Sequence, residues 1–195
     1  MPRPRKYDPE VVVEKAMHVF WEKGYEATSV QDLVEATGIN RFSMYQAFGD
    51  KRGLFLQALD YYFRHVLPQI VHLSEKSSGG VATIRRYFEA LETTVTSPLG
   101  HRGCFGQNTG VELARKDEIA LEPLNSMYAE LDRNFERALE TARERGSIRD
   151  DTPVAEIARF LVTIAQGMIL MAKTGRDHHF VRSSKRQVNA LLDRL

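Results

Sequence analysis

The sequence predicts an all-α protein of about nine helices, because apolar residues recur every three to four positions along almost the whole chain. No run alternates between apolar and polar residues, as a half-buried strand would. Glycine and proline interrupt the periodicity and separate the predicted helices. The chain has 195 residues, 43% of them hydrophobic, and is long enough to bury a substantial core.

A first helix is predicted to begin at Asp8 or Pro9 and to be closed by Gly24. Its apolar residues at helical spacing are Val12, Val13, Ala16, Val19 and Phe20. The segment before this helix is interrupted by proline and carries three cations with no acid among them, namely Arg3, Arg5 and Lys6. Such a basic arm can bind a phosphate backbone, and a merely solvated tail is the alternative.

Residues 29–51 show the pattern of a helix-turn-helix, which is two short capped helices with a short turn between them. Ser29 caps the first helix, and Asp32 three positions later completes a capping box. Gly38 ends that helix because glycine accepts a left-handed backbone, and Asn40 caps the second helix. In such units the second helix enters the major groove of DNA, so the pattern predicts DNA recognition.

The frame GINRFSMYQAFGDKRGLF, with Tyr45, Phe48 and Lys51, resembles the DNA-binding signature of the TetR family of bacterial transcriptional regulators. The preceding stretch FWEKGYEATSV resembles that family too, so the specific similarity covers roughly residues 9–60. The resemblance implies an N-terminal three-helix helix-turn-helix domain, followed by a helical C-terminal domain for effector binding and dimerisation. The expected domains are residues 1–52 and 53–195.

In that family the residues at Tyr45 and Lys51 bind phosphates, and exposed positions of the second helix touch bases. Carried over, Gln46 can pair with adenine, Ser43 can donate or accept, and Phe42 can lie against a thymine methyl. Phe42 stands where the family often has a small residue, and core packing is the alternative for both aromatic residues. The predicted DNA-binding set is Arg3, Arg5, Lys6, Thr28, Arg41, Phe42, Ser43, Tyr45, Gln46 and Lys51.

A long helix is predicted from Asp50 or Lys51 up to Pro68, which must kink or interrupt it. Residues 77–80, with two serines and two glycines, are the clearest linker. Further helices are expected at residues 81–97, 103–116, 118–145, 153–174 and 180–194.

The last two predicted helices are the candidates for a homodimer interface. The first has a wide apolar face, made by Val154, Ile157, Ala158, Leu161, Ala165, Met168 and Ile169. The second has an apolar stripe, made by Val188, Leu191, Leu192 and Leu195. A dimer places two reading helices on a palindromic operator, while an intramolecular core is the alternative for the same residues.

The family typically binds a small effector in its C-terminal domain, and the effector releases the protein from DNA. Residues 103–117 place polar groups in an apolar context, as an effector pocket needs. The predicted effector-binding residues are Phe88, Cys104, Gln107, Asn108, Glu112, Met127, Tyr128, Met168 and Met171. Ordinary core packing is the alternative for the methionine and aromatic residues.

Other classes of protein lack support in the sequence. It contains no phosphate-binding glycine loop, no catalytic serine or zinc-protease motif and no paired cysteines, so no enzyme, cofactor or metal is expected. The lone Cys104 is expected to be a small buried hydrophobe, with redox sensing as the alternative.

The expected location is the cytoplasm, with no membrane partner, because the most apolar stretch, Phe160 to Ala172, is short and no apolar run follows the basic start. The net charge of +1 neither supports nor excludes nucleic acid. The predicted function is a ligand-responsive, DNA-binding repressor, and a helical dimeric interaction module without sequence-specific DNA binding is the alternative.

Overall fold

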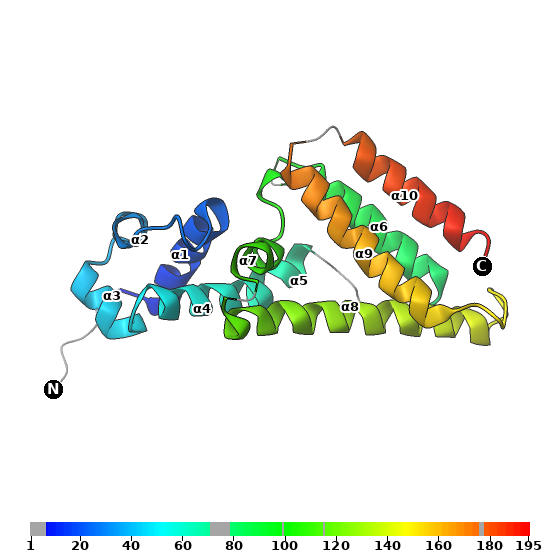
Figure 1. Ribbon diagram of the computed structural model, residues 1–195, viewed down its shortest axis with the longest axis horizontal. Coiled ribbons are helices and arrows are strands. Elements are labelled where there is room, and N and C mark those ends of the chain that lie inside the picture. The colour runs from blue at the N-terminus through cyan, green and yellow to red at the C-terminus, as the bar shows by residue number, and fades with distance from the viewer. Residues whose placement is uncertain (1–6, 71–78, 99, 115, 176–177) are drawn as a thin grey trace. The chain divides into compact units, whose positions relative to one another are not determined.

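The computed structural model of the chain describes residues 7–70, 79–98, 100–114, 116–175 and 178–195. These residues form helices and turns and contain no β-strand, which confirms the all-α prediction (Figure 1). The α-helices are α1 (Pro9–Lys23), α2 (Val30–Thr37), α3 (Arg41–Phe48), α4 (Lys51–Tyr61), α5 (Leu67–Ile70), α6 (Val81–Val95), α7 (Phe105–Leu113), α8 (Glu118–Glu144), α9 (Val154–Lys173) and α10 (His179–Leu192). A short 3₁₀ turn, η2 (Gly100–Arg102), precedes α7.

The helices α4 and α5 are joined without a break by a π-helical turn, η1 (Tyr62–Val66). Pro68 has no N–H to donate, and its ring disfavours an ordinary α-helix before it, so the hydrogen bonding becomes π-helical just ahead of it. The sequence predicted a kink or an interruption here, and the helix instead continues past Pro68 to Ile70. If this segment counts as one helix, the described residues form nine, as expected.

The chain divides into two compact units. The head unit comprises Met1–Leu67 and Phe105–Leu124, and the bundle unit comprises Pro68–Cys104 and Asn125–Leu195. The head unit thus includes α7 and the first turns of α8, which the sequence places far from the helix-turn-helix. The predicted domain boundary after residue 52 stays a prediction, and part of the predicted linker at 77–80 lies outside the described residues.

The core of the head unit is built on α1 and α4. The buried residues of α1 are Val12, Val13, Ala16, Met17, Phe20 and Trp21, and those of α4 are Leu54, Phe55, Ala58 and Leu59. Rings pack edge to face at the centre, where Phe20 lies 5.1 Å from Phe55 and Trp21 lies 5.1 Å from Tyr62, between ring centroids. This core supports the short helices α2 and α3, which have few buried residues of their own.

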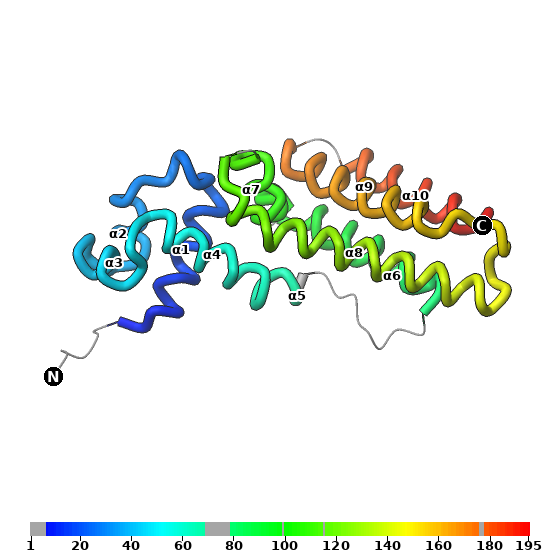
Figure 2. Tube along the Cα trace, turned by 60° about the horizontal axis from the view of Figure 1, so that its bottom comes forward, coloured from blue at the N-terminus to red at the C-terminus, as the bar shows by residue number. Residues whose placement is uncertain are grey.

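The bundle unit packs α6, α9, α10 and the part of α8 after Leu124 side by side (Figures 1 and 2). Its core contains most of the apolar residues that the sequence offered for a dimer interface, namely Val154, Ala158, Leu161, Ala165, Met168, Val188 and Leu192. These side chains therefore pack within one chain, and any dimer contact through α9 and α10 must use their other faces.

Candidate DNA-binding surface

The caps of α2 form as predicted. The Ser29 hydroxyl accepts the N–H of Asp32, and the Asp32 carboxylate accepts the N–H of Ser29. Lys23 lies 2.5 Å from this carboxylate, and its hydrogen bond, followed by those from Ser29, lowers the pKa of Asp32 to about 2. Gly38 ends α2 in the left-handed conformation with φ of 76°, which fixes the turn into α3.

The helix α3 presents a polar and aromatic face outward. Asn40 caps it by accepting the N–H of Ser43 at 2.8 Å. Met44 and Phe48, four positions apart on one side of the helix, are both buried. Phe42 is 74% exposed and Tyr45 is 42% exposed, so the structure places neither of them in the core. Arg41 and Gln46 are also exposed, and Ser43 is half-buried.

The N-terminal arm is described only from Tyr7 onward. The hydroxyl of Tyr7 donates to the carbonyl oxygen of Ser43 at 3.4 Å, which places the start of the described chain beside α3. Sequence reasoning did not single out this tyrosine, because no local pattern connects it with a residue 36 positions away. The three predicted phosphate ligands of the arm, Arg3, Arg5 and Lys6, lie outside the described residues.

Lys51 packs on the turn between α1 and α2. Its Nζ donates to the carbonyl oxygens of Tyr25 and Thr28, each at 2.9 Å, and lies 4.4 Å from the centroid of the Tyr25 ring. An ammonium group has three N–H donors, so these two bonds leave one for a further acceptor. The half-buried side chain is therefore held at one place at the start of α4.

Thr28 departs from the expectation that it contacts a phosphate. Its side chain is 1% exposed, and its hydroxyl donates to the carbonyl oxygen of Gly24 at 2.5 Å. Because this donor is buried and already engaged within the turn, Thr28 is poorly placed to contact a phosphate.

Three predicted effector-binding residues, Gln107, Asn108 and Glu112, lie on α7 and belong to the head unit. Phe105 at the start of α7 is buried against the aromatic core, with its ring centroid 5.9 Å from that of Phe55. The Glu112 carboxylate accepts the backbone N–H groups of Tyr25 at 2.9 Å and Glu26 at 2.7 Å. Glu112 thus contacts the same turn as Lys51.

A salt bridge that sequence reasoning missed lies beside this turn. The guanidinium of Arg52 donates to both carboxylate oxygens of Asp117, at 2.7 and 2.9 Å. This hydrogen bonding lowers the pKa of Asp117, and the same carboxylate caps α8 through the N–H of Ala120 at 3.2 Å. The two partners are 65 positions apart, so only the fold brings them together.

The other six predicted effector-binding residues belong to the bundle unit, so the structure does not gather the nine within one unit. Phe88, Cys104 and Met168 are buried there, Met127 and Tyr128 are half-buried, and Met171 is exposed. Burial, followed by the electrostatic interaction with Cys104, raises the pKa of the Tyr128 hydroxyl to about 12.

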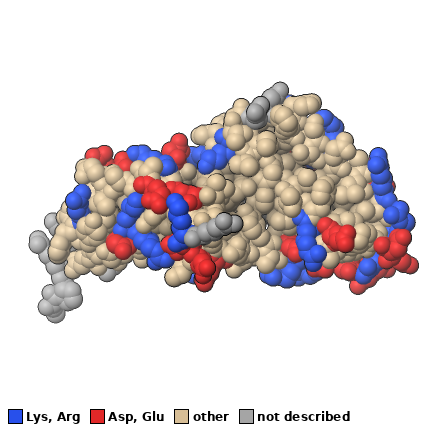
Figure 3. Space-filling model, in the orientation of Figure 1, with Lys and Arg blue, Asp and Glu red and all other residues tan. Residues whose placement is uncertain are grey.

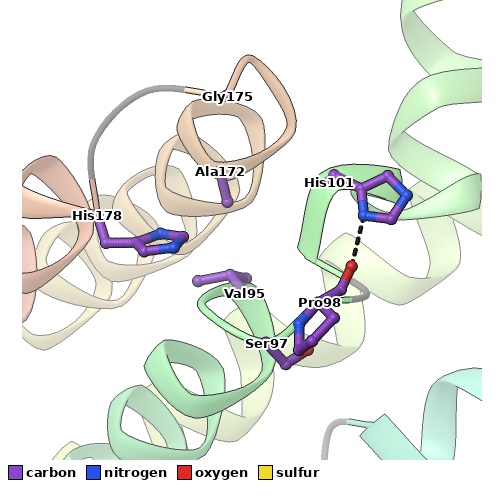
Figure 4. Close-up of a pocket in the computed structure, with 7 residues that line it drawn as sticks. All are labelled: Val95, Ser97, Pro98, His101, Ala172, Gly175 and His178. Atoms are coloured by element: carbon purple, nitrogen blue, oxygen red, sulfur yellow. Dashed lines mark hydrogen bonds between the residues drawn. The ribbon is translucent and has the colours of Figure 1, made fainter.

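A cavity of about 390 Å³ lies elsewhere in the bundle unit, and none of the nine predicted residues lines it (Figure 4). Its lining residues are Val95, Ser97, Pro98, His101, Ala172, Gly175 and His178. His101 and His178 come from opposite sides, and Nδ1 of His101 lies 2.5 Å from the carbonyl oxygen of Pro98. Nδ1 of His178 is buried without a hydrogen-bond partner among the described residues.

The described residues contain no group of three or more histidine, cysteine or acidic side chains that could hold a metal ion. One helix among them, α9, is long and apolar enough to cross a membrane by length and composition, a test that core helices of soluble proteins also pass. The helix is longer than the apolar stretch recognised in the sequence.

Comparisons with known proteins agree with this architecture. Residues 12–58 match the family model described as "Bacterial regulatory proteins, tetR family", and residues 80–188 match "Tetracyclin repressor-like, C-terminal domain". The HTH-type transcriptional repressor ComR of Escherichia coli is 34% identical over 174 residues, which cover 89% of this chain and 83% of that protein. The HTH-type transcriptional repressor DhaR of a Mycobacterium species is 30% identical over 167 residues, covering 85% and 82%.

A solved structure of the TetR family transcriptional regulator CifR, a cysteine mutant in complex with a 26-base-pair operator duplex, superposes with a TM-score of 0.82. It is 27% identical and covers 96% of this chain and 99% of its own. The two family models, the relatives that match most of the length, and the capped helix-turn-helix together show that the chain belongs to the TetR family of DNA-binding transcriptional regulators.

Proposed function

We propose that the protein is a homodimeric repressor that binds a palindromic operator and leaves it when a small effector binds. The observation that carries this proposal is the outward face of α3, where Phe42, Tyr45 and Gln46 are exposed on a helix anchored by Met44 and Phe48. Such a helix is short, so one copy reads few base pairs and two copies supply the affinity of a specific site.

The contacts divide into two kinds. Phe42, Ser43 and Gln46 read base edges in the major groove, since they carry an apolar ring, a hydroxyl and an amide. Tyr45 and Lys51 contact phosphates and set the register of the helix, and Arg41 is placed to do either. The basic arm of Arg3, Arg5 and Lys6 adds phosphate contacts beyond Tyr7, which already lies beside α3.

The dimer forms through the faces of α9 and α10 that the bundle core leaves uncovered. On α9, Phe160, Thr163, Gly167 and Leu170 follow one another at helical spacing and are exposed. The two small residues between the larger ones let a second helix approach closely. Figure 3 shows a broad surface without charged side chains over α9, and burial of this surface in a dimer accounts for its composition without a membrane.

The effector binds in the bundle unit, which has two candidate places. One is the neighbourhood of Cys104 and Tyr128, with the buried Phe88 and Met168 in the same unit. The other is the cavity with His101 and His178, where a buried nitrogen of His178 offers an unused polar atom (Figure 4). We propose no catalytic role for either place, and a cytoplasmic location suits a regulator whose target is DNA.

The test is a selection of bound duplexes from a random DNA pool by the purified protein. We expect an enriched palindrome, since a two-fold dimer presents two identical reading helices. Its two half-sites should lie about 10 base pairs apart, or a multiple of that. No enrichment at low and moderate salt would contradict the proposal and favour a helical dimeric interaction module that binds proteins.

The selected duplex also tests the division of roles. Gln46→Ala should change the preferred base at one position in each half-site, whereas Lys51→Met should weaken operator and unrelated DNA about equally. Equal losses from both variants on every sequence would contradict the assignment of Gln46 to base reading.

A further inference from the structure

One peptide group in the turn after α1 connects a carboxylate with an ammonium group. The peptide between Tyr25 and Glu26 donates its N–H to Oε1 of Glu112 at 2.7 Å, and its carbonyl oxygen accepts from Nζ of Lys51 at 2.9 Å. The second carboxylate oxygen of Glu112 accepts the N–H of Tyr25 at 2.9 Å. Consecutive hydrogen bonds polarise one another, so the negative charge of Glu112 strengthens the hydrogen bond from Lys51 to this carbonyl oxygen.

Glu112 reaches the turn because α7 is fixed to the head unit on both sides of this residue. Upstream, the ring of Phe105 is buried against Phe55 and Tyr62, with centroids 5.9 and 5.6 Å away. Downstream, Asp117 forms its two hydrogen bonds with Arg52. Two adjacent basic residues at the start of α4 are therefore held by acids. Glu112 of α7 acts on Lys51 through the peptide group, and Asp117, in the loop after α7, binds Arg52 directly.

Gly24 makes this contact possible. Its φ is +84°, which side chains rarely allow, and a Cβ placed on it would lie 2.9 Å from an oxygen of Glu112. The glycine that ends α1 thus also leaves the space in which the carboxylate reaches the two N–H groups.

We propose that Glu112 is a positioning residue for DNA binding, which holds the turn so that the Lys51 ammonium group is fixed with its third N–H available to a phosphate. The proposal rests on the phosphate-binding role given to Lys51 above. A lysine held by two carbonyl oxygens loses less conformational freedom when it binds than one that is free in solvent, so the turn raises the affinity for the duplex.

The sign of the effect separates positioning from simple electrostatics. Removal of a negative charge from a DNA-binding unit should strengthen binding to DNA, because repulsion from phosphates falls. If Glu112 positions Lys51, its replacement by glutamine should instead weaken binding. In Glu112 each carboxylate oxygen accepts one N–H of the turn, whereas a glutamine places an NH2 donor where one of these oxygens was, so one of the two hydrogen bonds is lost.

The experiment measures binding of the full-length Glu112→Gln protein to the selected operator by fluorescence anisotropy at several salt concentrations. We expect affinity to fall about tenfold for each head, as for loss of one charged hydrogen bond. The slope of log affinity against log salt concentration should become shallower by about 0.9 for each phosphate that the variant no longer binds. The matched control is Glu122→Gln, which removes the same charge from an exposed position and should not weaken binding.

A double variant tests whether Glu112 acts on DNA binding through Lys51. In a Lys51→Met background, Glu112→Gln should cause no further loss of affinity, because the ammonium group through which it acts is already absent. Thermal unfolding and titration of the active fraction show whether each variant is folded. If Glu112→Gln does not fold, Glu112→Asp replaces it, since it keeps the charge but shortens the reach, and a loss of the same sign is expected.

The outcomes distinguish the phosphate-binding role of Lys51 from the positioning role of Glu112. If Lys51→Met leaves affinity unchanged, the phosphate-binding role of Lys51 is wrong. If Lys51→Met weakens binding but folded Glu112→Gln does not, or if its loss persists unchanged in the Lys51→Met background, the positioning role of Glu112 is overturned.

Discussion

Replacement of Phe42 by alanine is expected to weaken operator binding without loss of stability. A phenylalanine offers roughly 150–250 Å² of surface, so 74% exposure leaves roughly 110–185 Å² open to solvent. If half of this area is buried against the duplex, the hydrophobic contribution is about 1.4–2.3 kcal/mol for each head at about 25 cal/mol per Å². The corresponding loss of affinity is about tenfold to fiftyfold.

The assay is fluorescence anisotropy with the selected operator and an unrelated duplex of the same length. Because Phe42 is uncharged and is proposed to read a base edge, the loss should be larger on the operator, and the salt dependence should not change. Val111→Ala is the control, since Val111 is an apolar residue that is also 74% exposed but lies on α7. This control should leave DNA binding unchanged.

Stability provides a second contrast on the same helix. Phe42→Ala should change the free energy of unfolding by no more than about 0.5 kcal/mol, whereas Phe48→Ala, at a 7% exposed position, should cost about 3–5 kcal/mol. Chemical denaturation measures both. Unchanged operator affinity of the folded Phe42→Ala protein would refute the assignment of this ring to the DNA surface.

Three further predictions concern other parts of the molecule. Gly24→Ala should lower the melting temperature and weaken DNA binding together, because it strains a backbone with φ of +84° and meets the Glu112 carboxylate; a normal melting curve would contradict this account. The pKa of Asp32 is lowered from 3.8 to about 2, so the ionised carboxylate stabilises the fold fully above pH 3.8 and loses this effect as pH falls through 2. The difference in melting temperature between Asp32→Asn and the parent should therefore shrink as pH falls from above 4 toward 2. A constant difference would contradict the stabilising role of Asp32. Phe160→Asp should shift the protein from dimer to monomer in sedimentation velocity, because it places a charge on the exposed stripe of α9, and an unchanged dimer would exclude that stripe from the interface.

The ends of α2 and α3 were predictable because each depends on residues a few positions apart. The Ser29 and Asp32 box, the left-handed Gly38 and the Asn40 cap all form as the local sequence indicates. The exposure of Phe42 was not predictable in the same way, since an aromatic residue on a short helix can lie either on the buried face or on the exposed face.

The role of α7 was beyond local reasoning. The polar Glu112 suggested a ligand pocket, but its partners are backbone groups 86 and 87 positions earlier in the chain. A backbone N–H has no residue type, so no pattern in the sequence marks it as the partner of a carboxylate. Only the packing of Phe105 into the aromatic core shows why this helix belongs to the head unit.

The head unit is built from two separate segments of the chain, which limits where the protein can be cut into fragments or joined to a relative. A fragment cut after residue 67 would contain the whole helix-turn-helix but would lose Phe105, Glu112 and Asp117, and would expose the rings that Phe105 covers. The DNA-reading part is therefore discontinuous in the chain. A chimera that exchanges operator specificity between relatives should keep residues 105–124 matched to the first 67, or else exchange α3 alone and leave the supporting contacts intact.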